Sequence, residues 1–274
     1  MSAPSWKKCL LVFVVGMSMV VVAFPFYWML LTAFTEKSFI FRPPISIIHF
    51  NFSLQNFREL ILGTEFLVYL KNSLIAASGA IVLNVFAATL AGYGLSRFRF
   101  WGKNTFIQAT LFTYMFPPML LAIPLYIIFA SLGMRNSYTG LILAHMSISL
   151  PLNIWIMWQY FQIVPVSLEE AAWVSGSSKF RTLIEICLPS AMPGIISVAV
   201  FAFSLSWNDF AFAFVLQTDQ AMFTLPVGLS TFVERTAIHW GMIMSSSALV
   251  SIPTFALVFF MQKYLMRGLG IARS

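Results

Sequence analysis

Long apolar segments alternate with shorter polar stretches along the 274 residues of the chain. A helix that crosses a bilayer needs about 20 consecutive, mainly apolar residues, and six segments reach that length. The pattern predicts an all-α membrane protein, one transmembrane domain over 1–274, in which lipid takes the place of water around most of the helices. The six transmembrane helices are expected at 9–34, 72–95, 105–131, 139–164, 190–216 and 244–262.

The polar stretch 165–189 stands out because it is patterned rather than merely hydrophilic. Ser167 and Glu170 have the spacing of a capping box at a helix start, and Gly176 suits the left-handed backbone of a helix end. A second helix is expected to begin near Ser178, with an apolar stripe formed by Phe180, Leu183, Ile184 and Cys187. The residues alone leave two interpretations open: a docking element for a soluble partner, or an amphipathic hairpin resting on the membrane.

Two features predict the shape and packing of the apolar helices. Pro117 and Pro118 are adjacent within 105–131, and two neighbouring prolines favour a break in a helix. Small residues cluster within 72–95, where they allow helices to pack closely in lipid; they are Ala87, Ala88, Ala91, Gly92 and Gly94.

A short amphipathic helix is predicted between the first two spans, where Leu54, Phe57, Leu60 and Ile61 are spaced for one helical face. Two interpretations of this helix remain open: it lies on the bilayer surface, or it contacts a partner.

Composition supports the membrane interpretation. Hydrophobic residues make up 59% of the chain and charged residues only 9%, and the mean hydropathy is +0.86, whereas soluble domains are about one-quarter charged. The net charge of +7 does not indicate nucleic-acid binding, because the basic residues are scattered around the membrane segments. Cys9 and Cys187 lie far apart and suggest neither a disulfide nor a metal site. The run 9–34 is too long for a cleaved signal sequence, so we expect an uncleaved first helix.

Basic residues predict the orientation. Lys and Arg are enriched in short cytoplasmic loops, and ten of the sixteen flank one side of the predicted helices. These ten are Lys7, Lys8, Arg97, Arg99, Lys103, Lys179, Arg181, Lys263, Arg267 and Arg273. Both termini and the stretch 165–189 are therefore expected in the cytoplasm.

The chain carries no recognisable catalytic or metal-binding constellation. It lacks the GxxxxGK[ST] phosphate loop, so we expect no enzymatic activity and no cofactor bound by this chain. Asp209 is the one acid inside a predicted span, and an ionisable residue there is a candidate for function. Trp207 and Asn208 beside it are possible solute contacts, although a Trp near a membrane interface is also common. His145 is expected to be a packing residue of a helix, with a position facing the pathway as the alternative.

The spaced positions of the polar hairpin carry a resemblance to a known family. Glu170-Ala171-Ala172, Gly176, Ile186 and Leu188-Pro189 match the EAA loop of ATP-binding-cassette importer permeases. The runs GYGLSRFRFWGKN (92–104) and SWNDFAFAF (206–214) also resemble carbohydrate-type permeases. Over essentially its whole length, the chain is similar to the six-helix membrane subunit of maltose-type sugar importers. It departs from the family pattern at Ser175, where relatives usually have an acid, and in its last five residues.

The resemblance implies a type I importer permease fold in a prokaryotic inner membrane and a sugar or sugar-like solute. Glu170 would be a polar anchor of a coupling helix, Gly176 its turn, and Ala171 and Ala172 a surface for close approach. The implied partners are a second permease in a heterodimer, two ATPase subunits that bind ATP and magnesium, and an extracytoplasmic solute-binding protein.

The alternative is a self-sufficient secondary transporter or channel. That class often shows internal repeats or several charges within the membrane. The sequence has no clear internal repeat, and Asp209 is the one acid inside a predicted span.

Overall fold

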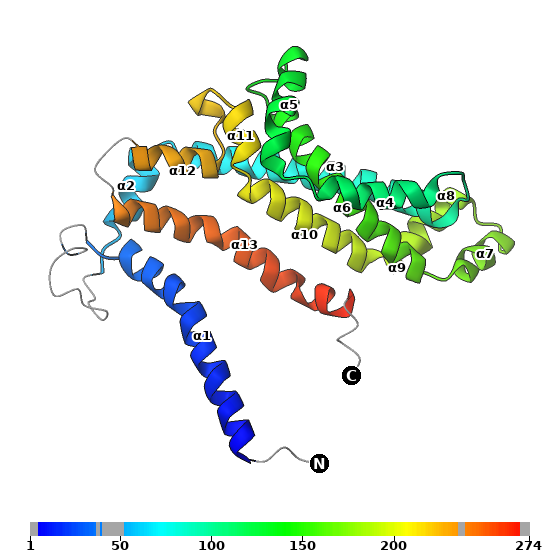
Figure 1. Cartoon of the computed structure of the whole chain (residues 1–274), viewed down its shortest axis with the longest axis horizontal. Helices are drawn as coiled ribbons and strands as arrows, with labels where there is room; N and C mark the ends of the chain where they lie inside the picture. The colour runs from blue at the N-terminus through cyan, green and yellow to red at the C-terminus, as the bar shows by residue number, and fades with distance from the viewer. Residues whose placement is uncertain (1–4, 37–38, 40–51, 235–238, 269–274) are drawn as a thin grey trace. The chain divides into compact units, whose positions relative to one another are not determined.

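The computed structural model describes residues 5–36, 39, 52–234 and 239–268, and within these ranges its regular elements are helices. An isolated bridge joins Thr35 to Phe52. Four helices are individually long and apolar enough to cross a membrane. These are α1 (Ser5–Ala33), α3 (Phe66–Arg97), α6 (Tyr138–Ile163) and α13 (Trp240–Gly268) (Figure 1). They coincide with four of the six predicted spans, which confirms the all-α membrane class.

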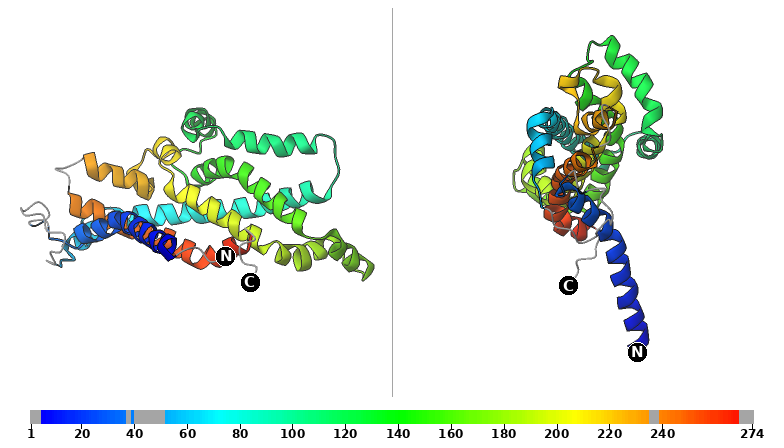
Figure 2. Two further views of the ribbon diagram at one scale, coloured as in Figure 1. Left: turned by 60° about the horizontal axis from the view of Figure 1, so that its bottom comes forward. Right: turned by 90° about the vertical axis from the view of Figure 1, so that its left-hand side faces the viewer.

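The predicted span 105–131 is not one straight helix. The chain forms α4 (Lys103–Tyr114) and α5 (Pro118–Ser131), whose axes differ by 101°. Figure 2 shows α5 turned away from the direction of α4. Pro117 has an extended backbone (φ −59°, ψ 125°) and Pro118 opens α5, where a missing N–H removes no helical hydrogen bond. The adjacent prolines therefore break the helix, as their position predicts.

The predicted span 190–216 is also interrupted. It consists of α10 (Met192–Asn208) and α11 (Ala211–Leu216), because Asp209 leaves the helical conformation with ψ 126°. A second bend, of 74°, lies at the start of α10. Among the described residues, two bent helix pairs, Lys103–Tyr114 with Pro118–Ser131 and Lys179–Ser190 with Met192–Asn208, would raise the number of spans from four to six if each pair crosses the membrane once. The second pair includes part of the polar stretch 165–189, so it does not coincide with the predicted span 190–216. The remaining elements are α2 (Gln55–Gly63), α7 (Val166–Val174), α8 (Lys179–Thr182), the π-helical η1 (Leu183–Cys187), α9 (Leu188–Ser190), the 3-10 turn η2 (Gln220–Met222) and α12 (Leu225–Glu234).

The chain divides into two compact units. The first comprises Met1–Phe66 and Leu229–Ile252, and the second comprises Leu67–Gly228 and Pro253–Ser274. In the first unit, the expected amphipathic helix is present as α2. Its buried Asn56 donates from Nδ2 to the carbonyl oxygens of Ala33 (3.0 Å) and Thr35 (2.8 Å).

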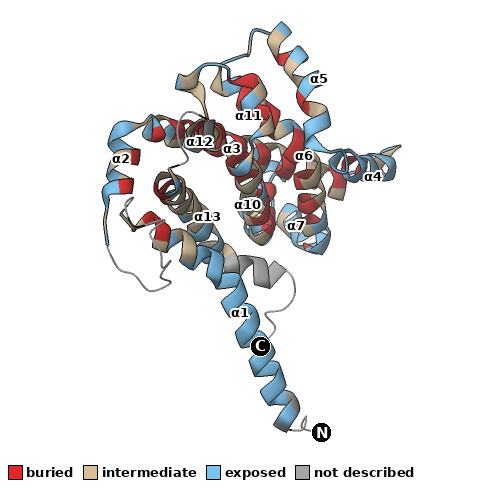
Figure 3. Cartoon of the chain, turned by 60° about the vertical axis from the view of Figure 1, so that its left-hand side comes forward, coloured by how far each residue is buried: buried red, intermediate tan, exposed pale blue. Residues whose placement is uncertain are grey.

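Most of α1 is exposed (Figure 3), and most of its exposed residues are large and apolar. Such a surface is unfavourable in water and suits lipid.

The second unit holds the larger core, in which α6 packs against α3, α4 and α10. Gly92 on α3 brings the two backbones together. A Cβ atom at that position would lie 2.6 Å from Cβ of Met157 and 2.8 Å from backbone atoms of α6. Of the predicted small residues, Gly92 therefore permits the close approach of α3 to α6, whereas an added Cβ at Gly94 would have no neighbour closer than 3.9 Å.

Candidate functional site

The first helix of the polar hairpin, α7, begins earlier than expected. Pro165 occupies the N-cap position, without a side-chain hydrogen bond, and Val166 is the first helical residue. Ser167 therefore lies inside the first turn and does not form the expected capping box with Glu170. The proline at the boundary sets the start, because it lacks a backbone N–H and its ring clashes with the preceding turn, which disfavours an extension of α6 into α7.

The end of α7 confirms the expected conformation of Gly176. Its φ is +88°, a left-handed value that glycine adopts without the steric cost of a Cβ atom. The Gly176 N–H donates to the carbonyl oxygen of Trp173, and the Ser177 N–H donates to that of Ala172, both at 2.9 Å. These bonds close the last turn of α7 and reverse the chain.

The second helix begins where expected and then changes type. Ser178 caps α8 by accepting a hydrogen bond from the Arg181 N–H (3.3 Å). The following segment η1 is a π-helix, whose wider turn changes which side chains share a face. Leu183 and Cys187 are buried, whereas Phe180 and Ile184 are exposed. The predicted apolar stripe is therefore only half correct.

A buried ion pair attaches the hairpin to the membrane helices. The Glu169 carboxylate, fully buried, accepts a bond from Arg97 Nε (2.5 Å) and one from the Tyr93 hydroxyl (2.9 Å). Arg97 also donates to the carbonyl oxygens of Phe161 and Val164 at 2.9 Å each. One guanidinium thus joins the ends of α3, α6 and α7.

The residues of the EAA motif differ in their exposure. Glu170 and Ala171 are exposed, and Ala172 is half-buried. Farther along, Ile186 and Leu188 are half-buried and Pro189 is exposed. The hairpin is thus anchored by Glu169 and presents the neighbouring Glu170 outward. Sequence reasoning missed Glu169; the signal was the pair Tyr93 and Arg97, one helical turn apart in a mostly apolar segment.

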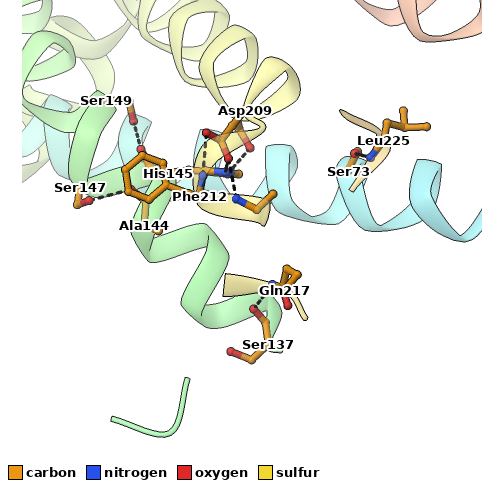
Figure 4. Close-up of polar contacts among 12 residues, drawn as sticks. Ser73, Ser137, Ala144, His145, Ser147, Ser149, Asp209, Phe212, Gln217 and Leu225 are labelled. Atoms are coloured by element: carbon orange, nitrogen blue, oxygen red, sulfur yellow. Dashed lines mark hydrogen bonds and ion pairs between the residues drawn. The ribbon is translucent and has the colours of Figure 1, made fainter. Parts of the chain in front are cut away.

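Asp209 lies at the break between α10 and α11, inside a polar network. Its carboxylate accepts from the backbone N–H of Ala213 (3.0 Å) and approaches that of Phe212 (3.4 Å), which caps α11. The same carboxylate lies 3.1 Å from His145 Nε2 (Figure 4). The other ring nitrogen, His145 Nδ1, lies 2.7 Å from the Ser206 hydroxyl. His145 is fully buried. It therefore packs as expected, but it also links α6 to the break.

The two residues before Asp209 lie in different surroundings. Trp207 is 1% exposed and stacks on Phe203 with ring centroids 5.2 Å apart. Asn208 is exposed, and its Nδ2 donates to the carbonyl oxygen of Ser204 (2.8 Å). In this conformation the Trp207 ring is not available for stacking on a solute, whereas Asn208 is accessible.

A second buried polar cluster links α3 to α6. Asn84 Oδ1 accepts from the Ser149 hydroxyl and from Asn153 Nδ2, both at 3.0 Å. All three residues are buried. Hydrogen bonds of this kind hold membrane helices together, so this cluster adds a polar contact to the close packing at Gly92.

Solved structures share this fold. A bacterial ABC transporter involved in the import of the acidic polysaccharide alginate has a chain that superimposes with a TM-score of 0.85, covering 97% of this chain and 99% of its own, at 18% identity. A chain of a bacterial alginate ABC transporter in complex with an alginate pentasaccharide-bound periplasmic protein gives a TM-score of 0.65 at 12% identity, covering 95% of this chain and 96% of its own.

Sequence relatives extend over nearly the whole chain. The trehalose/maltose transport system permease protein MalG of Thermococcus litoralis is 33% identical over 96% of this chain and 95% of its own length. The diacetylchitobiose uptake system permease protein DasC of Streptomyces coelicolor is 30% identical over 90% of this chain and 89% of its own. The model of one family matches residues 80–271. The chain belongs to the family of binding-protein-dependent transport system inner membrane components.

Proposed function

We propose that this chain is the membrane-spanning permease subunit of an ATP-driven, binding-protein-dependent importer for a sugar or sugar-like solute. The observation that carries the proposal is the geometry of the hairpin. Its motif residue Glu170 is exposed, while the adjacent Glu169 is bonded to Arg97 in the membrane part of the fold. The names of the relatives, which include permeases for trehalose/maltose and diacetylchitobiose, support a sugar as the solute.

The hairpin transmits motion from a separate ATPase subunit. Glu170 is the polar anchor on that subunit, and Ala171 and Ala172 permit close approach. Gly176 sets the turn, and Ile186, Leu188 and Pro189 complete the hairpin before α10. Because this chain lacks a phosphate loop, ATP and magnesium bind to two partner ATPase subunits. A short helix fixed by a buried ion pair transmits a displacement better than a flexible loop does.

The solute pathway passes near the break between α10 and α11. Asn208 is exposed there and offers an amide to sugar hydroxyl groups. Asp209 holds the break in place through α11 and His145. Trp207 contributes to solute contact only in a conformation in which its ring leaves Phe203.

The remaining partners follow from the family. A second, different permease completes the membrane pathway, and an extracytoplasmic solute-binding protein delivers the solute. With both termini and the hairpin in the cytoplasm, as the basic residues predict, the hairpin faces the ATPase subunits.

Co-reconstitution in proteoliposomes tests this function. The chain is expressed with its partner permease, ATPase and binding protein, and ATP-dependent sugar uptake is measured together with ATPase association. Glu170→Ala and Gly176→Pro should abolish both without preventing membrane insertion. Glu65→Ala removes an exposed acid outside the hairpin and should leave both unchanged. Uptake that persists without the ATPase subunit would show a self-sufficient transporter instead.

A further inference from the structure

The segment 98–103, which follows α3 and ends at the first residue of α4, exposes three aromatic side chains. Trp101 is 100% exposed, Phe98 58% and Phe100 51%. Such a cluster is unusual on a surface that faces only water. The segment directly follows a membrane-spanning helix, and Trp is enriched where a bilayer meets water. The aromatic residues therefore place this segment at the membrane–water interface.

Two cations lie among these aromatic side chains. Arg99 and Lys103 line a pocket of about 310 Å³ together with Phe100, Gly102, Asn104 and Thr105. Lys103 Nζ donates to the carbonyl oxygen of Phe98 (3.4 Å). Neither cation forms an ion pair with a carboxylate in the described part of the chain. In contrast, Arg97 just before them is fully engaged by Glu169 and by backbone carbonyl groups.

The pocket has the chemistry of an anion site. Asn104 and Thr105 add hydrogen-bond donors to the two positive charges. Gly102 stands at the N-cap of α4 with φ +83° and has no side chain to cap the first turn, so backbone N–H groups are also open to an anion. We propose that the segment 98–103 binds the phosphate headgroup of an anionic phospholipid at the membrane surface.

A phospholipid accounts for both the cations and the exposed aromatic rings of the segment. Arg99 and Lys103 bind the phosphate, because basic residues next to a transmembrane helix attract anionic lipids. Trp101 and the two phenylalanines contact the glycerol and the upper acyl chains. A free phosphate ion would need the cations but not the exposed aromatic rings.

Lipid binding to the full-length chain provides the test. The detergent-purified chain is delipidated and titrated with phosphatidylglycerol, with phosphatidylcholine and with glycerol 1-phosphate, and binding is measured by native mass spectrometry. We expect phosphatidylglycerol to bind most tightly. Arg99→Gln/Lys103→Gln should weaken that binding roughly thirty-fold, and Trp101→Ala should weaken binding of both phospholipids.

Matched variants decide the outcome. Arg99→Lys/Lys103→Arg keeps the charge and should retain binding. Arg58→Gln/Arg135→Gln removes the same charge from exposed positions elsewhere and should also retain it. The proposal is overturned if this second pair weakens binding as much as the first, if the two phospholipids bind equally, or if glycerol 1-phosphate binds as tightly as phosphatidylglycerol. Equal binding of phosphatidylglycerol by the wild type and by Arg99→Gln/Lys103→Gln would likewise overturn the proposal.

Discussion

Glu169 and Arg97 form a buried ion pair between residues 72 positions apart in the chain. Arg97 Nε lies 2.5 Å from Glu169 Oε1, and the two side chains are 10% and 0% exposed. The next residue, Glu170, is exposed. Two neighbouring glutamates therefore face opposite environments, one inside the fold and one on the surface that the coupling proposal assigns to the ATPase. Under the coupling proposal, this pair is the route by which a force on the hairpin would reach α3.

Arg97→Ala should strongly destabilise the protein, because it leaves the Glu169 carboxylate buried without a counter-charge. Loss of one partner of a buried pair costs about 3–5 kcal/mol. The free energy of unfolding is measured by titration with a denaturing detergent, followed by circular dichroism. Arg181→Ala is the control. It breaks a pair with Glu185 whose side chains are 67% and 55% exposed, and such surface pairs contribute about 1 kcal/mol or less.

An apolar double replacement separates the charge from the packing. Arg97→Met/Glu169→Leu removes both charges together, so it should recover much of the stability lost in Arg97→Ala. If the ion pair couples the hairpin to the membrane helices, ATP-dependent uptake should stay impaired even where stability returns. Full uptake by the double variant would mean that the pair only stabilises the fold.

Gly176→Ala should lower stability by about 1 kcal/mol through backbone strain alone. A Cβ atom at Gly176 would meet nothing within 4 Å, but the φ of +88° is unfavourable for alanine. Gly176→Asn should be tolerated better, because asparagine adopts left-handed conformations more readily. Gly63 has equally open surroundings and no positive φ, so Gly63→Ala should cost nothing. Equal effects at both glycines in the same unfolding titration would contradict this account.

Gly92→Ala should destabilise the contact between α3 and α6. The new methyl group would overlap Met157 and the α6 backbone, and overpacking of this kind typically costs about 1–3 kcal/mol. Gly94 lies two residues away, where the nearest atom to an added Cβ would be Phe98 Cδ2 at 3.9 Å. Gly94→Ala should therefore be neutral or slightly stabilising. Thermal stability in detergent measures the difference, which vanishes if α3 and α6 are less closely packed.

The helical class and the break at Pro117 were predictable because they depend on local properties. Apolar length defines a membrane helix, and adjacent prolines remove backbone donors wherever they occur. The left-handed turn at Gly176 is local in the same sense. The start of α7 was predicted wrongly because two local signals competed, and Pro165 prevailed over the Ser167 cap.

Contacts between distant residues were not predictable from spacing. Glu169 and Glu170 are the same residue type at consecutive positions, and only the fold decides which one meets Arg97. The role of His145 depends on Ser206 and Asp209, which lie 61 and 64 residues further along the chain. The π-helical turn at 183–187 likewise rotated the face that was predicted to be apolar.

Asp209 variants should distinguish a structural role from contact with the solute. Asp209→Ala removes the cap of α11 and the partner of buried His145, so it should cost about 2 kcal/mol or more. Asp209→Asn keeps an oxygen for the Ala213 N–H and should cost less. Asp219→Ala is the control, since Asp219 is exposed and caps the short turn η2 through the Ala221 N–H (3.0 Å).

If Asp209 instead binds the solute directly, Asp209→Asn would raise the KM for uptake while leaving the free energy of unfolding unchanged. A structural role predicts the reverse. Asp209→Ala should then be less stable than Asp209→Asn, and both should be less stable than the wild type. The KM for uptake should stay close to that of the wild type wherever the protein remains folded.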